Sequence, residues 1–252
     1  MVAGSMKVGG AGGRWRQSDA DPSGGPMSSA RRRGRSFRNT MVRRTERTPA
    51  MATLSLTQFL TLDGVVQAPG GPDEDRGDGF AHGGWSVPYG DEDFGRFMDE
   101  VFARPTAFLL GRRTYDIFAG YWPKRTDPEN PVAAKLNGLP KYVVSSTLTE
   151  ADWAGTTLLR GDAAQEVAGL KERLDGEIQM HGSAGLARTL LDHDLIDTLH
   201  LLVFPVVLGT GRRLFTDGVR PTAFRPAGTR TTAAGVAIHT HELEGRPSYG
   251  SY

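Results

Sequence analysis

Apolar residues between positions 51 and 245 recur with two different periods, and the switches between the periods predict strands that alternate with helices. Alternating or continuous apolar runs predict strands at residues 54–60, 106–110, 141–145, 156–159, 177–180, 196–208 and 236–243. Apolar spacings of three and four predict helices at residues 91–103, 115–119, 163–174 and 186–193. Residues 67–79 and 120–140 follow neither period, so we expect long loops there, with room for one short helix in the second.

This order of elements predicts an α/β fold, a single domain with a mostly parallel sheet and helices on both faces. No helical segment separates the last two apolar runs, 196–208 and 236–243, so we expect the sheet to end in antiparallel strands. We place the domain at residues 51–246 and expect a short C-terminal tail at residues 247–252.

The first fifty residues differ from the rest in composition. They carry eleven lysines and arginines against three acidic residues, a net charge of +8, whereas the remainder carries −7. Because this segment is rich in Gly, Ser and Arg and poor in large apolar residues, we expect it to be disordered. Its basic cluster at residues 31–47 is typical of an arm that binds nucleic acid, of a transit-like extension, or of a translated leader.

The apolar pattern begins within three residues of Met51, which favours a leader with the true start at Met51 or Met41 rather than Met1. Nucleic acid is therefore a disfavoured partner. The chain has no cysteine, which excludes disulfides, thiolate metal sites and cysteine nucleophiles. No apolar run reaches membrane-spanning length and no secretory segment is present, so we expect a cytoplasmic protein without membrane contact.

Two glycine turns, each between a predicted strand and a predicted helix, carry the candidate chemistry. The first comprises Gly111, Arg112, Arg113 and Thr114. Backbone N–H groups at a helix start and the helix dipole favour an anion, and two guanidinium groups beside a hydroxyl suit a phosphate monoester. A plain strand–helix turn with two solvated arginines fits the same residues equally well.

The second turn comprises Gly182, Ser183, Ala184, Gly185 and Leu186. Its glycines let the backbone approach a pyrophosphate, although they also fit tight packing of a helix on a strand. Parallel strands end at one edge of a sheet, where ligands bind in such folds, so both turns can open there. Two cradles suit a dinucleotide, and Ser145 and Ser146, after the third strand, add donors at that edge.

Four motifs make the chain resemble the dihydrofolate reductase-like superfamily, and within it the reductase domain of the bacterial bifunctional riboflavin-biosynthesis protein. They are FLTLDGVVQ (59–67), LLGRRTYDIF (109–118), VVSST (143–147) and the run 181–215, where HGSAGLARTLL, IDTLHL and LGTGRRLF follow in order. The resemblance implies that fold and an NADPH-dependent reductase of a small heterocyclic substrate, with 5-amino-6-(5-phosphoribosylamino)uracil the nearest analogy. The stretch 111–114 then binds the adenosine side with its 2′-phosphate, and Ser145, Ser146 and residues 182–186 line the rest of the dinucleotide.

Two aspartates are candidates for orienting or protonating the substrate. Asp63 follows the first strand, where the riboflavin-type relatives place an aspartate that faces substrate, although Asp-Gly is also a common turn. Asp91 follows Trp85 and Pro88 one residue later than the folate reductases place their acid, and it also fits an N-cap. We therefore rank Asp63 first and Asp91 second, with Trp85 either lining the pocket or packing in the core.

Several features stay open at this level. His181 fits either a phosphate contact or packing, and Arg212 and Arg213 either touch the cofactor or are solvated. His239 and His241 share one strand face, but two ligands without a third do not make a metal site, so no metal is expected. The apolar run 196–208 is a candidate subunit interface, which makes a homodimer the expected assembly.

Two other functions fit the same residues: a dihydrofolate reductase-type pterin reductase, and a non-catalytic dinucleotide-binding module whose basic arm recruits nucleic acid. A shortened chain that begins at Met51 separates the enzyme from the module. We expect its NADPH oxidation rate, followed by absorbance, to match that of the full chain. Loss of the main activity with intact cofactor binding would favour the module instead.

Overall fold

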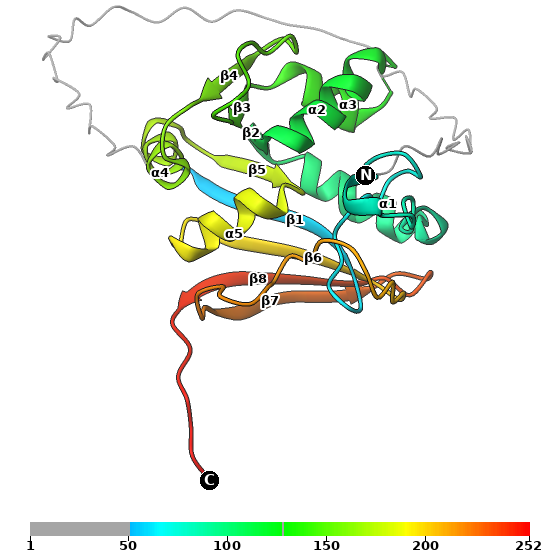
Figure 1. Cartoon of the computed structure of the whole chain (residues 1–252), viewed down its shortest axis with the longest axis vertical. Coiled ribbons are helices and arrows are strands. Elements are labelled where there is room, and N and C mark those ends of the chain that lie inside the picture. The colour runs from blue at the N-terminus through cyan, green and yellow to red at the C-terminus, as the bar shows by residue number, and fades with distance from the viewer. Residues whose placement is uncertain (1–50, 128) are drawn as a thin grey trace, which may run out of the picture. The chain divides into compact units, whose positions relative to one another are not determined.

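An eight-stranded sheet organises the computed structural model, which describes residues 51–127 and 129–252 (Figure 1). Its strands are β1 (Thr53–Thr61), β2 (Pro105–Gly111), β3 (Lys141–Val144), β4 (Thr156–Leu159), β5 (Glu177–His181), β6 (Thr198–Phe204), β7 (Ala223–Thr231) and β8 (Ala237–Gly245). They lie in the order β4-β3-β2-β5-β1-β6-β8-β7. Neighbours from β4 to β6 are parallel, whereas β8 is antiparallel to β6 and β7, which confirms the predicted sheet.

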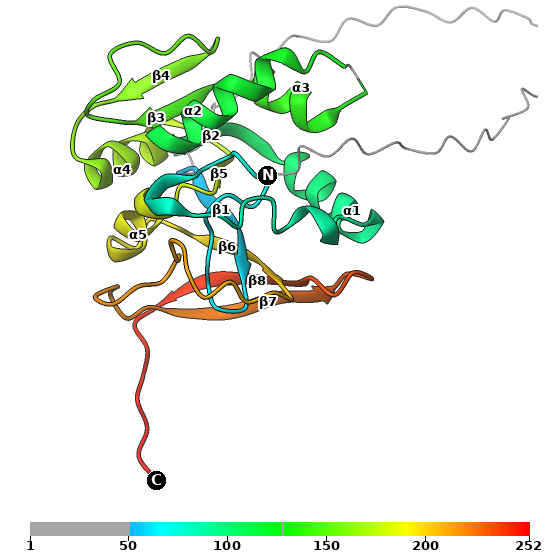
Figure 2. The ribbon, with the colours of Figure 1, turned by 45° about the vertical axis from the view of Figure 1, so that its right-hand side comes forward.

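Helices cover both faces of the sheet, as predicted (Figure 2). They are α1 (Glu92–Phe102), α2 (Arg112–Tyr121), α3 (Pro131–Gly138), α4 (Ala163–Arg173) and α5 (Ala184–Asp192), with short 3₁₀ turns η1 (Gly77–Gly79), η2 (Val87–Tyr89) and η3 (Trp122–Lys124). The first three helices pack on one face over an aromatic core that includes Phe94, Phe108 and Phe204. The other two pack on the opposite face over an aliphatic core that includes Leu56 and Ile178.

The central position of β1 explains why its polar residues are buried. Leu54 to Leu60 alternates apolar and polar residues, a pattern typical of a strand with one face in water. Helices lie over both faces of β1, and Ser55, Thr57 and Gln58 are each 3% exposed. Buried polar side chains in the middle of a sheet need hydrogen-bond partners. The partners of these three side chains therefore have to be identified.

Two elements differ from the sequence prediction. The helix expected at 115–119 extends over the whole of α2, whereas α3, which begins at Pro131, is a short helix of the kind expected within 120–140. Strand β7 was not predicted, because seven of its nine residues are exposed at the edge of the sheet and carry no apolar alternation. Within the run 196–208, Leu199, Leu202 and Phe204 of the inner strand β6 are buried in the two cores. Val207, after the end of the strand, is 64% exposed, so an interface at this run stays a prediction.

The ends of the chain bear on the predicted domain limits. β8 ends at Gly245, and residues 247–252 have no helix or strand. The expectations for residues 1–50, namely disorder, a basic arm or leader, and a start at Met41, lie outside the described residues. Across the part of the chain that is described, no helix combines the length and apolar character that crossing a bilayer requires.

A buried lysine joins β3 to α3. The Lys141 side chain is fully buried, and its Nζ donates to the carbonyl oxygens of Leu136 (2.8 Å), Leu139 (2.8 Å) and Asn137 (3.5 Å). The ammonium also lies 4.7 Å from the centre of the Trp153 ring. Burial lowers the pKa of Lys141. Its donors satisfy carbonyl groups at the end of α3 that have no partner within the helix.

Replacing this lysine by methionine tests that role. Lys141→Met keeps the length of the side chain but leaves two well-bonded carbonyl groups buried without a donor, so we expect a loss of about 2–3 kcal/mol in unfolding free energy. Urea unfolding measures the loss. The half-buried Lys135 gives a control, because Lys135→Met removes only a long contact of 3.4 Å to Ala103 O. Equal stability of both variants would contradict the role.

Candidate functional site

Strand β5 ends before its neighbours, which leaves an opening at the edge of the sheet where the carboxyl ends of the strands lie. Pairing of β1 with β5 ends at Thr57 and His181, whereas pairing of β1 with β6 continues to Thr61 and Phe204. On the other side, β2 continues to Gly111, where it pairs with β3. The chain after β5 turns at once into α5. A gap therefore remains between the ends of β1 and β2, at the edge where ligands bind in such sheets.

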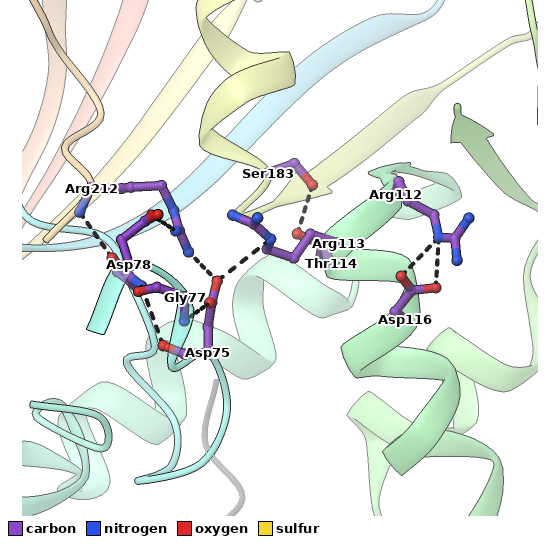
Figure 3. Close-up of polar contacts among 10 residues, drawn as sticks. Asp75, Gly77, Asp78, Arg112, Arg113, Thr114, Asp116, Ser183 and Arg212 are labelled. Carbon is purple, nitrogen blue, oxygen red and sulfur yellow. Dashed lines mark hydrogen bonds and ion pairs between the residues drawn. The ribbon is translucent and has the colours of Figure 1, made fainter. Parts of the chain in front are cut away.

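The two glycine turns meet at this gap (Figure 3). The Ser183 hydroxyl accepts a hydrogen bond from Gly111 N (2.9 Å) and donates to Thr114 Oγ1 (2.9 Å). A side chain at Gly111 would bring its Cβ to 3.3 Å from Ser183 Cβ, which explains the glycine. Gly182 has φ of +70° and Ser183 has φ of +61°, so the second turn is left-handed and presents the first turn of α5 to the gap. Helices α2 and α5 thus begin side by side.

A cavity of about 350 Å³ occupies the gap. Of the sequence-predicted cofactor residues, those in both glycine turns line it: Gly111, Arg112, Arg113, Thr114, Gly182, Ser183, Ala184, Gly185 and Leu186. An apolar wall comes from Phe59, Met98, Ile117 and Phe118. The charged lining consists of four arginines and two acids, so the cavity is net positive: Arg112, Arg113, Arg188, Arg212, Glu74 and Asp75. Such a lining attracts an anionic ligand.

A carboxylate from the long loop 67–79 lies between two of these arginines (Figure 3). Asp75 forms an ion pair with Arg212 and lies 3.7 Å from Arg113 Nε, and its side chain is 13% exposed. Arg212 also pairs with Asp78 at 2.9 Å. On α2, Arg112 Nε donates to both carboxylate oxygens of Asp116, at 2.7 and 2.8 Å. The arginines are thus held by neighbouring acids beside the cavity.

His181 is a neutral packing residue in the lining of the cavity. Its ring stacks on Phe102 at 4.6 Å between centres, and burial lowers the pKa of His181 to about 3. Gln179 Nε2 donates to Val101 O at 2.7 Å, which leaves Gln179 Oε1 to accept from His181 Nε2 at 3.1 Å. The neutral imidazole therefore carries its proton on Nε2, where it is donated to Gln179 and not to a phosphate.

Comparison with known proteins identifies the family. Residues 52–238 match the model of the RibD C-terminal domain. The chain belongs to the RibD C-terminal domain family. The uncharacterized protein YyaP of Bacillus subtilis (strain 168) is 29% identical over 188 residues, which are 74% of this chain and 92% of YyaP. YwjB of the same organism is 28% identical over 184 residues, 71% of this chain and 92% of its own.

Solved structures share the fold of this RibD-type domain. A putative riboflavin biosynthesis protein from Shewanella sp. PV-4 matches with a TM-score of 0.55 at 20% identity, over 76% of this chain and 99% of its own. A pyrimidine reductase-like protein from Corynebacterium diphtheriae matches with a TM-score of 0.50 at 12% identity, over 77% and 92%. The Thermotoga maritima diaminohydroxyphosphoribosylaminopyrimidine deaminase/5-amino-6-(5-phosphoribosylamino)uracil reductase gives 0.51 at 16% identity, over 77% and 57%. These matches confirm the predicted fold.

Asp63, the first-ranked acid from the RibD-type resemblance, lies outside the cavity lining. Its carboxylate accepts from Thr61 Oγ1 (2.6 Å) and from the N–H groups of Leu208 (3.2 Å) and Gly209 (2.9 Å). Arg213 adds an ion pair at 3.2 Å. The Thr61 hydroxyl, followed by the two backbone donors, lowers the pKa of Asp63 to about 2. In this arrangement Asp63 clasps the turn after β1 to the turn after β6.

Asp91, the second-ranked acid, is the N-cap of α1 and also lies outside the cavity lining. One carboxylate oxygen accepts from Phe94 N (2.8 Å) and the other from Ala234 N (2.6 Å). Burial raises the pKa of Asp91, but these hydrogen bonds outweigh burial and keep the pKa below its ordinary value. Trp85 packs in the core with its Nε1 donating to Gln67 O (2.7 Å).

The remaining predicted residues do not line the cavity. The Ser145 hydroxyl accepts from the N–H groups of Thr147 (3.2 Å) and Leu148 (3.0 Å), so it closes its own turn beside the end of β2, and neither it nor Ser146 lines the cavity. The rings of His239 and His241 stack on each other at 5.9 Å. Among the described residues, no three metal-ligating side chains come together.

Sequence reasoning missed six polar residues of the cavity: Thr57, Gln58, Gln67, Glu74, Asp75 and Arg188. Glu74 and Asp75 lie in a loop without periodicity, so nothing in the pattern points to the cavity. Thr57 and Gln58 lie in an alternating run that is typical of a strand with one face in water, so only their burial in the structure points to them.

Replacing Asp63 by asparagine separates a structural clasp from a catalytic acid. Because the pKa is about 2 in the folded chain against an ordinary 3.8, the stabilisation is complete above the ordinary value and is lost as the pH falls towards 2. For a clasp, Asp63→Asn lowers the unfolding free energy by about 1–3 kcal/mol at neutral pH, and the difference shrinks in acid. Urea unfolding across the pH range measures this, with exposed Asp217→Asn as control. A collapse of turnover at unchanged stability would identify a catalytic acid instead.

Proposed function

We propose that this protein is an NADPH-dependent reductase of a small heterocyclic substrate, related in reaction to the reductases of riboflavin biosynthesis. The observation that carries the proposal is the meeting of the two glycine turns, joined through the Ser183 hydroxyl, at a net positive cavity. Membership of the RibD C-terminal domain family supports a reductase, and the Thermotoga maritima neighbour is by its name a 5-amino-6-(5-phosphoribosylamino)uracil reductase.

The residues present fit a dinucleotide. Gly182 leaves the mouth of α5 open, since a Cβ added there would lie 3.7 Å from Thr114 Oγ1 and narrow the space between the turns. Two residues of the lining each carry a buried polar atom without a hydrogen-bond partner, Thr57 Oγ1 and Gln58 Oε1, and a ligand with polar groups would supply such a partner. NADPH supplies the hydride when bound, so the protein's task is to bind, align and exclude water.

Each part of the lining has a role in this proposal. Arg112 and Arg113, at 41% and 64% side-chain exposure, reach the 2′-phosphate with guanidinium N–H groups. The first turn of α5 binds the pyrophosphate through its backbone N–H groups. Ser145 and Ser146 extend this edge beyond Gly111 towards the adenosine. The apolar wall, including Met98 and Phe118, packs against the flat face of the substrate ring and excludes water from the reacting pair.

The acids have positioning roles in the proposal. Asp63 and Asp91 hold the loops that surround the substrate end of the cavity, and Asp75 holds Arg113 and Arg212 at its mouth. Because Asp75 already pairs with two arginines, the phosphate competes with a carboxylate for Arg113. Part of the arginine charge is thereby neutralised before any ligand binds.

Removal of the two arginines tests the cofactor assignment. In the variant with Arg112→Ala and Arg113→Ala, we expect NADPH affinity to fall about 10- to 100-fold, because charge-assisted hydrogen bonds to the 2′-phosphate are lost. NADH affinity should change far less, since NADH lacks that phosphate. Fluorescence titration with each cofactor measures both constants, followed by oxidation with a panel of pyrimidines, pterins and quinones.

The exposed Arg225, which pairs with Glu242 at the far edge of the sheet, supplies the control variant Arg225→Ala. Equal weakening of NADPH and NADH by the double replacement would overturn the 2′-phosphate assignment. Binding of neither cofactor by the unaltered protein would overturn the proposed function.

A further inference from the structure

Two residues of the cavity lining each carry a buried polar atom without a hydrogen-bond partner. Thr57 Oγ1 and Gln58 Oε1 belong to side chains that are 3% exposed, and both residues line the cavity. In the described part of the chain, Thr156 Oγ1 and Asp194 Oδ1 are also buried without a partner, but neither residue lines the cavity. A buried polar group without a partner costs stability, so its presence at a ligand cavity points to a ligand that supplies the missing partner.

The orientation of the Gln58 amide defines what that partner must be. Gln58 Nε2 donates to Phe59 O at 3.1 Å, a backbone carbonyl that accepts and cannot donate. The nitrogen is therefore the end of the amide that faces Phe59, and the oxygen Oε1 is the end left without a partner. An amide oxygen only accepts. The ligand must bring an N–H or O–H group to this point.

The position of Gln58 on β1 indicates which part of the ligand it contacts. Successive strand residues point to opposite faces, so Gln58 shares the face of Leu56 and Leu60, which pack in the core beneath α4 and α5. Ala184 and Leu186 of the second glycine turn pack against the same core. Thr57 points to the opposite face, with Phe59 and the apolar wall beneath α1. Because β5 ends at His181, the two faces communicate through the gap.

We propose that Gln58 is a specificity-determining residue that accepts a hydrogen bond from the carboxamide N–H of the nicotinamide ring. This inference rests on the proposed function. The carboxamide is the polar group of that ring that donates a hydrogen bond, and the second glycine turn, which would hold the pyrophosphate, lies on the same face as Gln58. The bond satisfies Oε1 and fixes the rotation of the ring in the gap.

A cofactor analogue without the donor tests this pairing directly. The analogue is the 3-acetylpyridine form of NADPH, in which a methyl group replaces the amide NH₂ of the carboxamide. We expect the unaltered protein to bind NADPH about tenfold more tightly than the analogue, as judged by fluorescence titration. The variant Gln58→Met keeps the length of the side chain without the amide, so it should bind both equally. Gln58→Leu repeats the test with a different shape.

Two controls keep the result specific. 2′,5′-ADP carries the adenosine half without the nicotinamide ring, so its dissociation constant should be unchanged in Gln58→Met. Thr156→Val removes a buried unpartnered hydroxyl outside the cavity and should keep the full preference for NADPH. Preference retained in both Gln58 variants would overturn the inference while leaving the proposed function intact. Binding of neither NADPH nor 2′,5′-ADP by the unaltered protein would instead overturn the proposed function.

Discussion

The short length of β5 is the constraint on which the site depends. A strand that stops at His181 while its neighbours continue leaves backbone and side chains of β1 without a partner in the middle of the sheet. The left-handed turn at Gly182 and Ser183 occupies the space beyond the end of β5. That turn is then bonded to the end of β2 by one hydroxyl group. Without the early end, α5 would begin farther along the sheet and the two turns would not meet.

Charge in the cavity is arranged in opposed pairs rather than as a bare positive patch. Asp75 and Asp116 each hold a guanidinium group near the place proposed for a phosphate. Such pairs fix the direction of long side chains that would otherwise lose conformational entropy when a ligand binds. They also neutralise part of the arginine charge beside the cavity.

Much of the fold was predictable because the sequence pattern of most segments agrees with the element that each forms in the structure. The parallel strands, the antiparallel end and most helices follow from apolar periodicity, and the two glycine turns follow from the placement of Gly111 and Gly182 after apolar runs. β7 was missed because an exposed edge strand has no apolar face to reveal it. The roles of Asp63 and Asp91 depend on backbone N–H groups of Gly209 and Ala234, more than 140 residues away in sequence. Local patterns carry no trace of such partners.

The exposed strand β7 also bears on how copies of this chain can associate. An edge strand normally presents a row of free N–H and C=O groups that a second molecule can extend. Here Pro226 removes one donor, the register shifts between Pro226 and Gly228, and Arg225 and Arg230 add charge along the strand. Each feature discourages the addition of another strand at this margin. Any self-association of the chain must therefore use a face or a loop surface instead of a continuous intermolecular sheet at β7.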